Sequence, residues 1–299
     1  MENIPIVVLF VVSMAANLLG GLVRTYYSKS VSSSMAGYHL FNAVSSLVCG
    51  VTLLALSGGD FRMSAYTLVT ALIFGVITAL QQVTNSAALS LGPWSYTSVI
   101  ASMSTVITAL SGTLFFDETI RTTQIFGIAL MLVCLVLSVA KENGEQKKKT
   151  LRWFLISLVC LCCCGGVGLM QKIHQSSAHR EELTMFLVIA FLCSFVFSSV
   201  NLAILRCGKG EKTPVFDRKT AVWMLVCLFV AGGIGIALNN LINLYLSGVV
   251  ASAVFFPIVN GGGLVLITLA SVILFREKLS GRQWIGLALG IAATLLLCI

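Results

Sequence analysis

The sequence predicts an all-α polytopic membrane protein, with ten transmembrane helices in two inverted repeats of five helices. Three observations predict this fold: the composition, the lengths of the apolar runs and an internal repeat. Of the 299 residues, 58% are hydrophobic and only 10% are charged. Soluble globular domains carry about 25% charged residues, so this composition is typical of a chain that lies in a lipid bilayer.

Apolar runs of roughly 18 to 25 residues follow one another along the chain, and each can cross a hydrocarbon core of about 30 Å as a helix. Ten runs are predicted as helices, at 4–23, 37–57, 66–90, 94–116, 123–140, 152–171, 184–205, 221–246, 249–275 and 283–298. No loop between them is long enough for a soluble domain, so ligand binding is expected within the bundle. Four tryptophans near helix ends are expected at the lipid–water interface, namely Trp94, Trp153, Trp223 and Trp284.

The basic residues predict how these helices are oriented. The loops after the first, third, fifth, seventh and ninth predicted helices hold fifteen of the nineteen Lys and Arg residues. By the positive-inside rule these loops face the cytoplasm, which leaves both termini outside. The same distribution accounts for the net charge of +8 without a nucleic-acid partner. We expect a multi-pass protein of the cell membrane, in contact with the lipid bilayer.

An internal repeat divides the chain. The segment FFDETIRTTQIFGIAL at 115–130 matches LFREKLSGRQWIGLAL at 274–289 at an offset of 159 residues. Upstream, QQVTN at 81–85 matches NNLIN at 239–243 at an offset of 158 residues.

The repeat predicts the domain organisation. A first five-helix repeat is expected at 1–141, a basic linker at 142–151 and a second five-helix repeat at 152–299. Five crossings begin and end on opposite faces, so the second repeat must be inverted relative to the first. Inverted repeats are the architecture of many secondary transporters, whose substrate binds near the midplane between the halves.

The two halves share a motif. It reads F-x-E-(x5)-Q-x-x-G-x-x-L and starts at Phe116 in the first half and at Phe275 in the second. With this motif at both expected junctions of a 5+5 arrangement, the chain resembles the EamA-like branch of the drug/metabolite transporter superfamily. The resemblance covers nearly the whole chain. It implies a carrier of small organic metabolites or drugs, with a substrate pocket between the halves.

Neutral polar side chains inside the predicted helices form the candidate substrate site. The amides of QQVTN share one helix face at spacings of three and four residues, and those of NNLIN repeat this geometry. In the helix at 249–275, Pro257 and three following glycines are expected to bend the helix or to permit close approach. The predicted substrate-binding residues are Asn17, Gln81, Gln82, Asn85, Tyr96, Ser98, Ser102, Asn239, Asn240, Asn243, Pro257 and Asn260.

Two interpretations of the buried amides stay open. Amides can join helices through interhelical hydrogen bonds, or they can line a pocket, and both can hold for different residues. The cationic side chains near helix ends also have two interpretations. Arg24, Lys172 and His174, with Gln171 beside them, either snorkel to the interface or attract an anionic substrate at the two mouths.

Carboxylates are absent from the predicted helix interiors. None of the eleven Asp and Glu residues lies within an apolar run. Intramembrane carboxylates normally mark proton relays and cation sites, so facilitated diffusion or exchange is favoured over proton coupling. The motif acids Glu118 and Glu277 lie at helix junctions, where they interact with exposed N–H groups or serve as a gate.

No metal or other cofactor is predicted. Consecutive helical positions point about 100° apart, so Cys162, Cys163 and Cys164 cannot converge on one ion. Gly286 and Gly290 form a GxxxG that favours close packing, either within the bundle or between two copies of the chain. A homodimer through the helices at 123–140 and 283–298 is therefore one hypothesis.

The predicted function is secondary transport. The expected substrate is a small polar organic metabolite, amino-acid-like or amine-like and neutral or zwitterionic, moved by alternating access as an exchanger or facilitator. The alternatives within transport are a broad-specificity drug exporter and a flippase for lipid-linked substrates. From other classes, a non-transporting scaffold and an intramembrane enzyme compete. No HExxH motif, paired intramembrane carboxylates or Ser-His-Asp set is present, so no enzyme is predicted.

Overall fold

The fold consists of helices in the part of the chain that the computed structural model describes. That part comprises residues 5–59, 61–116, 145–209, 228–250, 252–276 and 281–298, with nine positions between 121 and 133. Its α-helices are α1 (Ile6–Tyr26), α2 (Met35–Leu56), α3 (Ala65–Leu91), α4 (Trp94–Ser102), α5 (Ser104–Phe116), α7 (Glu145–Gln175), α8 (Leu183–Lys209), α10 (Ile236–Val249), α11 (Ser252–Leu274) and α12 (Gly281–Cys298). Two π-helical segments, η1 (Tyr27–Val31) and η3 (Leu228–Gly235), and a 3-10 turn, η2 (Arg180–Glu182), complete them. The predicted all-α class is confirmed for these residues.

Several helices have the length and composition of membrane spans. Among the described residues, five helices are long and apolar enough to cross a bilayer, and they are Ile6–Val31, Met35–Leu56, Ala65–Leu91, Leu151–Gln175 and Arg180–Gly208. Nine of the ten predicted apolar runs coincide with described helices, whereas the run at 123–140 lies largely outside the described residues. The protein is thus membrane-embedded, and the total of ten crossings stays a prediction.

Local sequence explains where the helices begin. The side chain of Ser34 accepts a hydrogen bond from the Gly37 N–H and caps α2, and Ser64 caps α3 by accepting from the Thr67 N–H. Each serine satisfies one of the N–H groups that a helix start leaves without a partner. Pro93 immediately precedes α4, where its fixed φ suits a helix start.

Two predicted boundaries differ from the structure. The run at 94–116 was predicted as one helix but is divided at Met103 into α4 and α5. The hydroxyls of Ser102 and Thr105 donate to the carbonyls of Val99 and Ser102, both at 2.8 Å, and such back-bonding competes with the helical pattern. In the second case, α7 begins at Glu145, inside the predicted linker, because EQKKK consists of strong helix formers.

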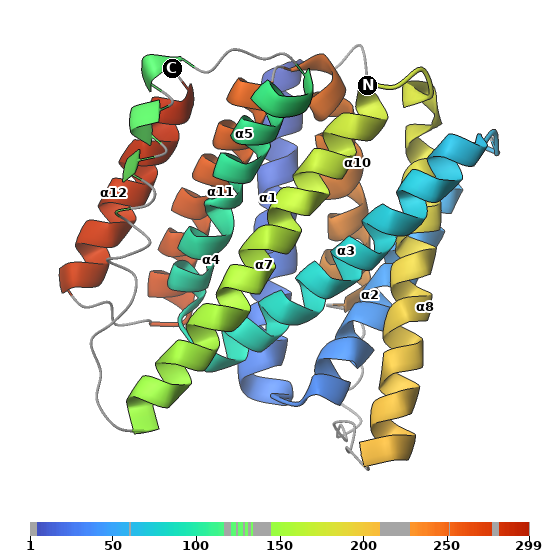
Figure 1. Ribbon diagram of the computed structural model, residues 1–299. Coiled ribbons are helices and arrows are strands. Elements are labelled where there is room, and N and C mark those ends of the chain that lie inside the picture. Colours follow the sequence, from blue (N-terminus) through green and yellow to red (C-terminus); the bar gives the residue numbers. More distant parts are fainter. Residues whose placement is uncertain are drawn as a thin grey trace.

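The helices form a bundle in which α1 lies near the middle (Figure 1). α12 and α8 lie at opposite edges, and the first and last described residues lie at the same end of the bundle. Helices far apart in sequence are neighbours: α2 packs on α8, α3 on α7 and α8, α1 on α10 and α11, and α4 on α11. Segments from both predicted halves therefore alternate through the bundle.

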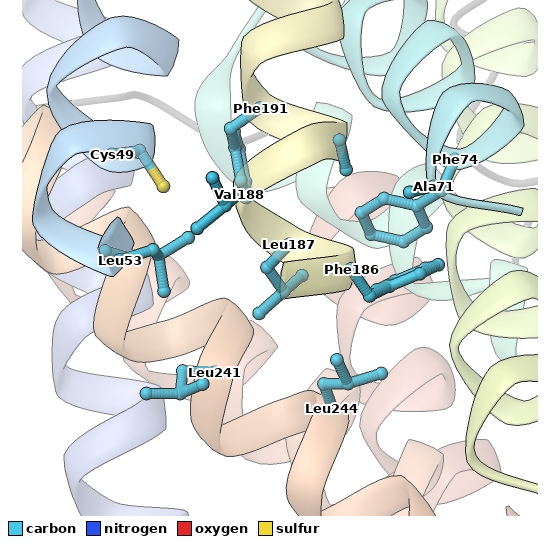
Figure 2. Close-up of a cluster of buried hydrophobic side chains, with 12 residues drawn as sticks. Cys49, Leu53, Ala71, Phe74, Phe186, Leu187, Val188, Phe191, Leu241 and Leu244 are labelled. Atoms are coloured by element: carbon cyan, nitrogen blue, oxygen red, sulfur yellow. The ribbon is translucent and has the colours of Figure 1, made fainter. Parts of the chain in front are cut away.

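A buried apolar cluster holds α2, α3, α8 and α10 together (Figure 2). The rings of Phe74 and Phe186 pack with their centroids 5.0 Å apart. At Gly75 a Cβ atom would lie 2.5 Å from the carbonyl oxygen of Ala190, so the glycine permits close approach of α3 to α8. Within a bilayer, such small residues provide the close van der Waals packing that joins helices.

Two of the four tryptophans expected at the lipid–water interface face other helices and not the lipid-facing surface. Trp94 is 3% and Trp153 5% exposed, and both lie inside the bundle. The indole N–H of Trp153 donates to Thr97 Oγ1 at 3.1 Å, and Trp94 packs edge-on against Phe275. A buried hydrogen-bond partner satisfies the Trp153 indole N–H without the interface. Trp223 lies outside the described residues.

Candidate functional site

A cavity of about 260 Å³ lies within the helix bundle. Its walls come from α1, α3, α4 and α5 on one side and from α7, α10 and α11 on the other. Ten of the twelve predicted binding residues line this cavity, and they are Asn17, Gln81, Gln82, Asn85, Ser98, Ser102, Asn239, Asn240, Asn243 and Asn260. The two amide clusters, which stand far apart in sequence, thus face one space.

The other two predicted residues do not line the cavity. Tyr96 is 1% exposed and packs against Trp153, with ring centroids 6.3 Å apart. The side chain points to the neighbouring helix, because Tyr96 lies two positions from the lining residues Trp94 and Ser98, and residues two apart do not share a helix face. The side chain of Pro257 lies outside the described residues, and the helix around it is continuous from Ser252 to Leu274.

The glycines after Pro257 serve close approach and not bending. A Cβ atom at Gly262 would lie 2.5 Å from the sulfur of Met14 on α1. At Gly263 a Cβ atom would lie 3.6 Å from Asn17 Nδ2. Gly262 therefore permits the close contact of α11 with Met14 of α1, whereas a Cβ atom at Gly263 would make only an ordinary van der Waals contact.

The amides of α10 are partly occupied with one another. Asn243 Nδ2 donates to Asn239 Oδ1 at 3.2 Å. The hydroxyl of Ser13 on α1 donates to this pair, 2.6 Å from Asn243 Oδ1 and 2.9 Å from Asn239 Oδ1. Asn240 Nδ2 bonds back to the Ile236 carbonyl at 2.9 Å. This cluster therefore joins α1 to α10 and lines the cavity as well.

The amides of α3 differ from each other in their partners. Gln81 Nε2 contacts the sulfur of Cys164 on α7 at 3.5 Å, and Gln82 Oε1 accepts from the guanidinium of Arg24. In the described part of the chain, the side chain of Asn85 makes no hydrogen bond, although it is only half-buried and faces the cavity. The same holds for Asn17 on α1.

Asn42 shows what an amide looks like when it only joins helices. It is 1% exposed and does not line the cavity. Its Nδ2 donates to Ser198 Oγ at 2.6 Å and to Ser194 Oγ at 3.2 Å, and its Oδ1 accepts from Ser46. The hydrogen-bonding capacity of Asn42 is used within the α2–α8 contact, whereas that of Asn17 and Asn85 is directed at the cavity.

Asn260 connects the two predicted halves of the chain at the cavity wall. Its Nδ2 donates to Thr105 Oγ1 at 2.7 Å, which ties α11 to α5 just after the break at Met103. Ser102 lines the cavity at the same break, and its hydroxyl donates to the Val99 carbonyl. The interrupted helix thus brings hydroxyl groups to the cavity wall.

Arg24 lies inside the bundle, which contradicts the interpretation that it snorkels to the interface. Its side chain is 8% exposed, lines the cavity and lies over the ring of Phe41 at 5.6 Å. One terminal nitrogen donates to Gln82, while Nε has no partner among the described residues. His174 is likewise fully buried, stacked on Phe186 at 4.2 Å.

Several polar residues of the cavity wall were not predicted as binding residues from the sequence. Thr78 lies one turn before Gln82 on α3, and its hydroxyl is buried without a partner among the described residues. The i, i+4, i+7 spacing of Thr78, Gln82 and Asn85 could have revealed it. The other missed polar residues of the wall are Ser104, Thr108, Cys164 and Gln171, with Trp94 beside them.

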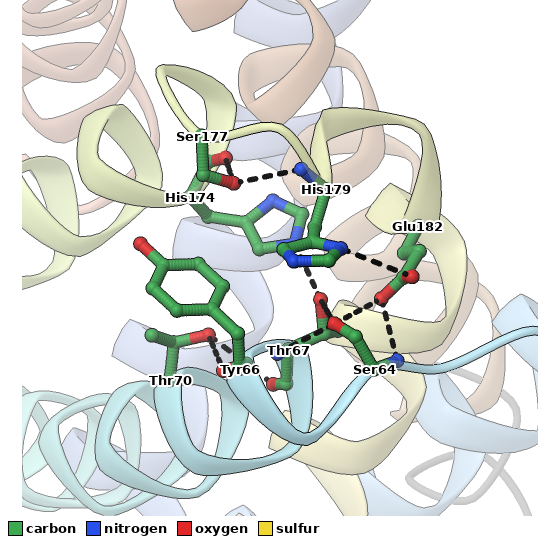
Figure 3. A network of polar contacts seen from close by, with 8 residues as sticks. All are labelled: Ser64, Tyr66, Thr67, Thr70, His174, Ser177, His179 and Glu182. Atoms are coloured by element: carbon green, nitrogen blue, oxygen red, sulfur yellow. Dashed lines mark hydrogen bonds and ion pairs between the residues drawn. The ribbon is translucent and has the colours of Figure 1, made fainter.

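A second polar cluster closes the end of the bundle at which the described chain begins (Figures 1 and 3). The carboxylate of Glu182 accepts from the backbone N–H and the hydroxyl of Ser64, each at 2.9 Å. Next to it, the Thr67 hydroxyl lies 3.4 Å from His174 Nε2. The rings of Tyr66 and His179 stack with centroids 5.5 Å apart. This cluster fastens the α7–α8 connection onto the start of α3.

Comparison with known proteins supports the fold but names no family. No family model matches the chain, and no curated protein matches it. A solved structure described as "Crystal structure of protein" is similar over 96% of this chain and 97% of that chain, with a TM-score of 0.62 and 15% identity. At this identity the similarity shows a shared helical fold over nearly the whole chain and no shared function. The resemblance to EamA-like transporters stays a hypothesis.

Proposed function

We propose that the protein is a secondary transporter that moves a small polar organic metabolite across the membrane by alternating access. The observation that carries the proposal is a cavity within an apolar bundle, lined by amides of both predicted halves. Polar side chains in membrane-embedded helices are costly and usually face a cavity or a partner. Asn17 and Asn85 face the cavity without a protein partner among the described residues, as expected of groups that bind a substrate.

The proposed architecture is ten crossings in two inverted five-helix repeats. The helix packing supports it. When each helix is replaced by its proposed counterpart in the other half, pairs of helices in contact become other pairs that are also in contact. α1 would correspond to α7, α2 to α8, α3 to η3 with α10, and α4 with α5 to α11. The contact of α3 with α7 then matches that of α10 with α1, and the contact of α5 with α7 matches that of α11 with α1. The α2–α8 and α4–α11 pairs map onto themselves.

The proposed inverted symmetry suits transport by alternating access. Two halves related by inversion can rock against each other about a central site, which opens it to each side in turn. The end formed by Ser64, His174 and Glu182 is fastened by hydrogen bonds. By the charge distribution this end would be the extracellular one, with the basic loops in the cytoplasm and both termini outside.

The size and lining of the cavity favour a small metabolite over the alternatives. About 260 Å³ is below the roughly 300–1,000 Å³ of pockets that hold drug-sized ligands. A lipid-linked substrate would also need an apolar groove for its chain, whereas nine amide side chains line this cavity. A scaffold would have no need of cavity-facing amides without a partner. We propose an exchanger or facilitator that acts without a cofactor.

Counterflow in proteoliposomes tests the proposal. The full-length protein would first be tested by thermal shift against a library of small metabolites, because a ligand that binds only the folded state raises the melting temperature. Stabilising compounds would then be loaded unlabelled inside liposomes, and uptake of the labelled compound would be followed. We expect transient accumulation with the wild type and none in protein-free liposomes. Binding without accumulation for every stabilising compound would contradict transport.

A further inference from the structure

A single charged side chain lines the cavity among the residues that the structure describes, and it is Arg24. No Asp or Glu lies within ion-pair distance of it in the same part of the chain. A buried charge is normally paired, since desolvation strongly penalises an isolated ion. An uncompensated guanidinium beside an internal cavity therefore calls for an anion that arrives from outside the protein.

The surroundings of Arg24 hold the guanidinium in place and leave donors available. The Phe41 ring supports it from one side, and Gln82 Oε1 accepts from one terminal nitrogen. A guanidinium has five N–H donors in a fixed fork. The Nε donor is buried without a partner among the described residues. A side chain held by one neutral acceptor, with further donors unused, is arranged to bind a planar oxyanion in two-pronged geometry.

The walls near Arg24 leave room for such a group. Gly20 and Gly21 line the cavity one turn before Arg24 on the same helix. At Gly21 a Cβ atom would lie 2.8 Å from the ring of Trp94, which also lines the cavity. The absence of a side chain at Gly21 brings the Trp94 ring against α1, and both glycines line the cavity beside Arg24 without a side chain of their own.

We propose that Arg24 binds the acid group of the substrate and that the substrate is a small organic monocarboxylate. This inference rests on the proposed transport function and narrows its substrate class. One bound carboxylate neutralises the one guanidinium, so the occupied cavity carries no net charge in the low-dielectric interior. A phosphate monoester carries nearly two negative charges near neutral pH and would leave one of them uncompensated here.

The rest of the cavity fits the remainder of such a molecule. Asn17, Asn85 and Ser98 line it, and their side chains make no hydrogen bond within the described part of the chain. These groups suit neutral hydroxyl, carbonyl or amide functions. No carboxylate lines the cavity in that part of the chain, so a substrate ammonium would find no counter-charge. An acid with neutral polar substituents is thus favoured over an amine.

Matched compounds test the proposal on the full-length wild-type protein. The probes are α-hydroxy monocarboxylates of three to six carbon atoms. They are compared with matched compounds in which a primary amide, an amine or a phosphate monoester replaces the carboxylate. Binding is measured by thermal shift and transport by counterflow in proteoliposomes. We expect the carboxylates to bind at least tenfold more tightly than their amides and amines. Equal or tighter binding of the amides, the amines or the phosphate monoesters would overturn the proposal.

Variants of Arg24 give a second test. We expect R24Q to lose carboxylate binding at least tenfold while the difference between acid and amide disappears, and R24K to retain part of that difference. The control is K29Q, five residues further along, because Lys29 lies over the Phe275 ring at 5.5 Å and does not line the cavity. Unchanged acid preference in folded R24Q would overturn the proposal. If R24Q does not fold, the wild-type comparison of acids with amides still decides.

The same experiments separate this inference from the proposed transport function. Suppose that amines show counterflow, that N85L abolishes it and that R24K leaves it unchanged. This result would support the proposed transport function and overturn the proposed carboxylate site at Arg24. Carboxylate binding that depends on Arg24, with no flux of any probe, would sustain the site and contradict transport.

Discussion

The carboxylate of Glu182 accepts two hydrogen bonds from Ser64, one from its backbone N–H and one from its hydroxyl, both at 2.9 Å (Figure 3). Ser64 also caps α3, so a single carboxylate fastens the start of α3 to the turn that precedes α8. The pair closes one end of the bundle beside the buried ring of His174.

The first prediction is that E182Q destabilises this end. The amide replaces a charge-assisted acceptor by a neutral one, so at least one of the two hydrogen bonds weakens, and we expect a loss of about 1–2 kcal/mol. Thermal unfolding of the purified protein measures the effect. E181Q is the control, because the neighbouring Glu181 makes no hydrogen bond to Ser64. Equal melting temperatures for the two variants would show that the Ser64 pair contributes nothing.

The second prediction concerns the α3–α8 contact. In G75A the new Cβ atom would lie 2.5 Å from the Ala190 carbonyl oxygen and 2.8 Å from Cys193 Cβ. Backbone cannot yield as a flexible side chain can, so the helices must separate, and we expect destabilisation by about 1–3 kcal/mol. Helix propensity alone would favour alanine over glycine. In the matched control G208A a Cβ atom would meet nothing within 4 Å. Unchanged stability of G75A would mean that α3 and α8 can separate at this contact without loss of stability.

Most of the polar site could be predicted from the sequence, because its amides repeat at helical spacing. Residues three and four apart share a helix face, so the Gln81–Asn85 and Asn239–Asn243 clusters could be assigned to one face each. That both faces meet at one cavity follows from the internal repeat combined with burial of polar groups. The prediction for Tyr96 was wrong because this residue lies two positions from Ser98, which places it on another face of α4 than the cavity-lining serine.

Arg24 could not be placed from sequence, because a cation near a helix end has the same signature whether it snorkels or turns inward. Its burial depends on α3 and α2 supplying Gln82 and Phe41, which are contacts between distant segments. The Met103 break was missed for a related reason. Back-bonding hydroxyls are compatible with a continuous helix, and the Asn260–Thr105 hydrogen bond stabilises the interrupted form only in the folded bundle.

The third prediction is that transport does not require a proton gradient. No Asp or Glu lines the cavity in the described part of the chain, and Glu181 and Glu182 lie at the end of the bundle. Glu118 and Glu277 lie outside the described residues. Among the described residues, therefore, no carboxylate lies beside the cavity to exchange a proton for the substrate. Counterflow should persist with equal pH on both sides and with the membrane potential clamped. Strict dependence on an imposed gradient would contradict this expectation.

The last prediction separates amides that bind substrate from amides that join helices. N85L should weaken substrate binding and leave the melting temperature unchanged, because Asn85 faces the cavity and makes no hydrogen bond within the described part of the protein. Loss of one hydrogen bond in a low-dielectric site costs about 1–3 kcal/mol, or roughly five- to 150-fold in affinity. The matched control N42L should do the opposite, since Asn42 is fully engaged between α2 and α8.

Asn243 falls between these two cases. It lines the cavity, but it also accepts from Ser13 and donates to Asn239. We therefore expect N243L to lower both the melting temperature and the affinity, whereas sequence symmetry alone would have made it equivalent to N85L. Both quantities would be measured for each variant, with the stabilising compounds of the thermal-shift screen as ligands. Unchanged affinity in both N85L and N243L would remove these amides from the binding site. Asn260 and Arg24 would then be the next cavity residues to test.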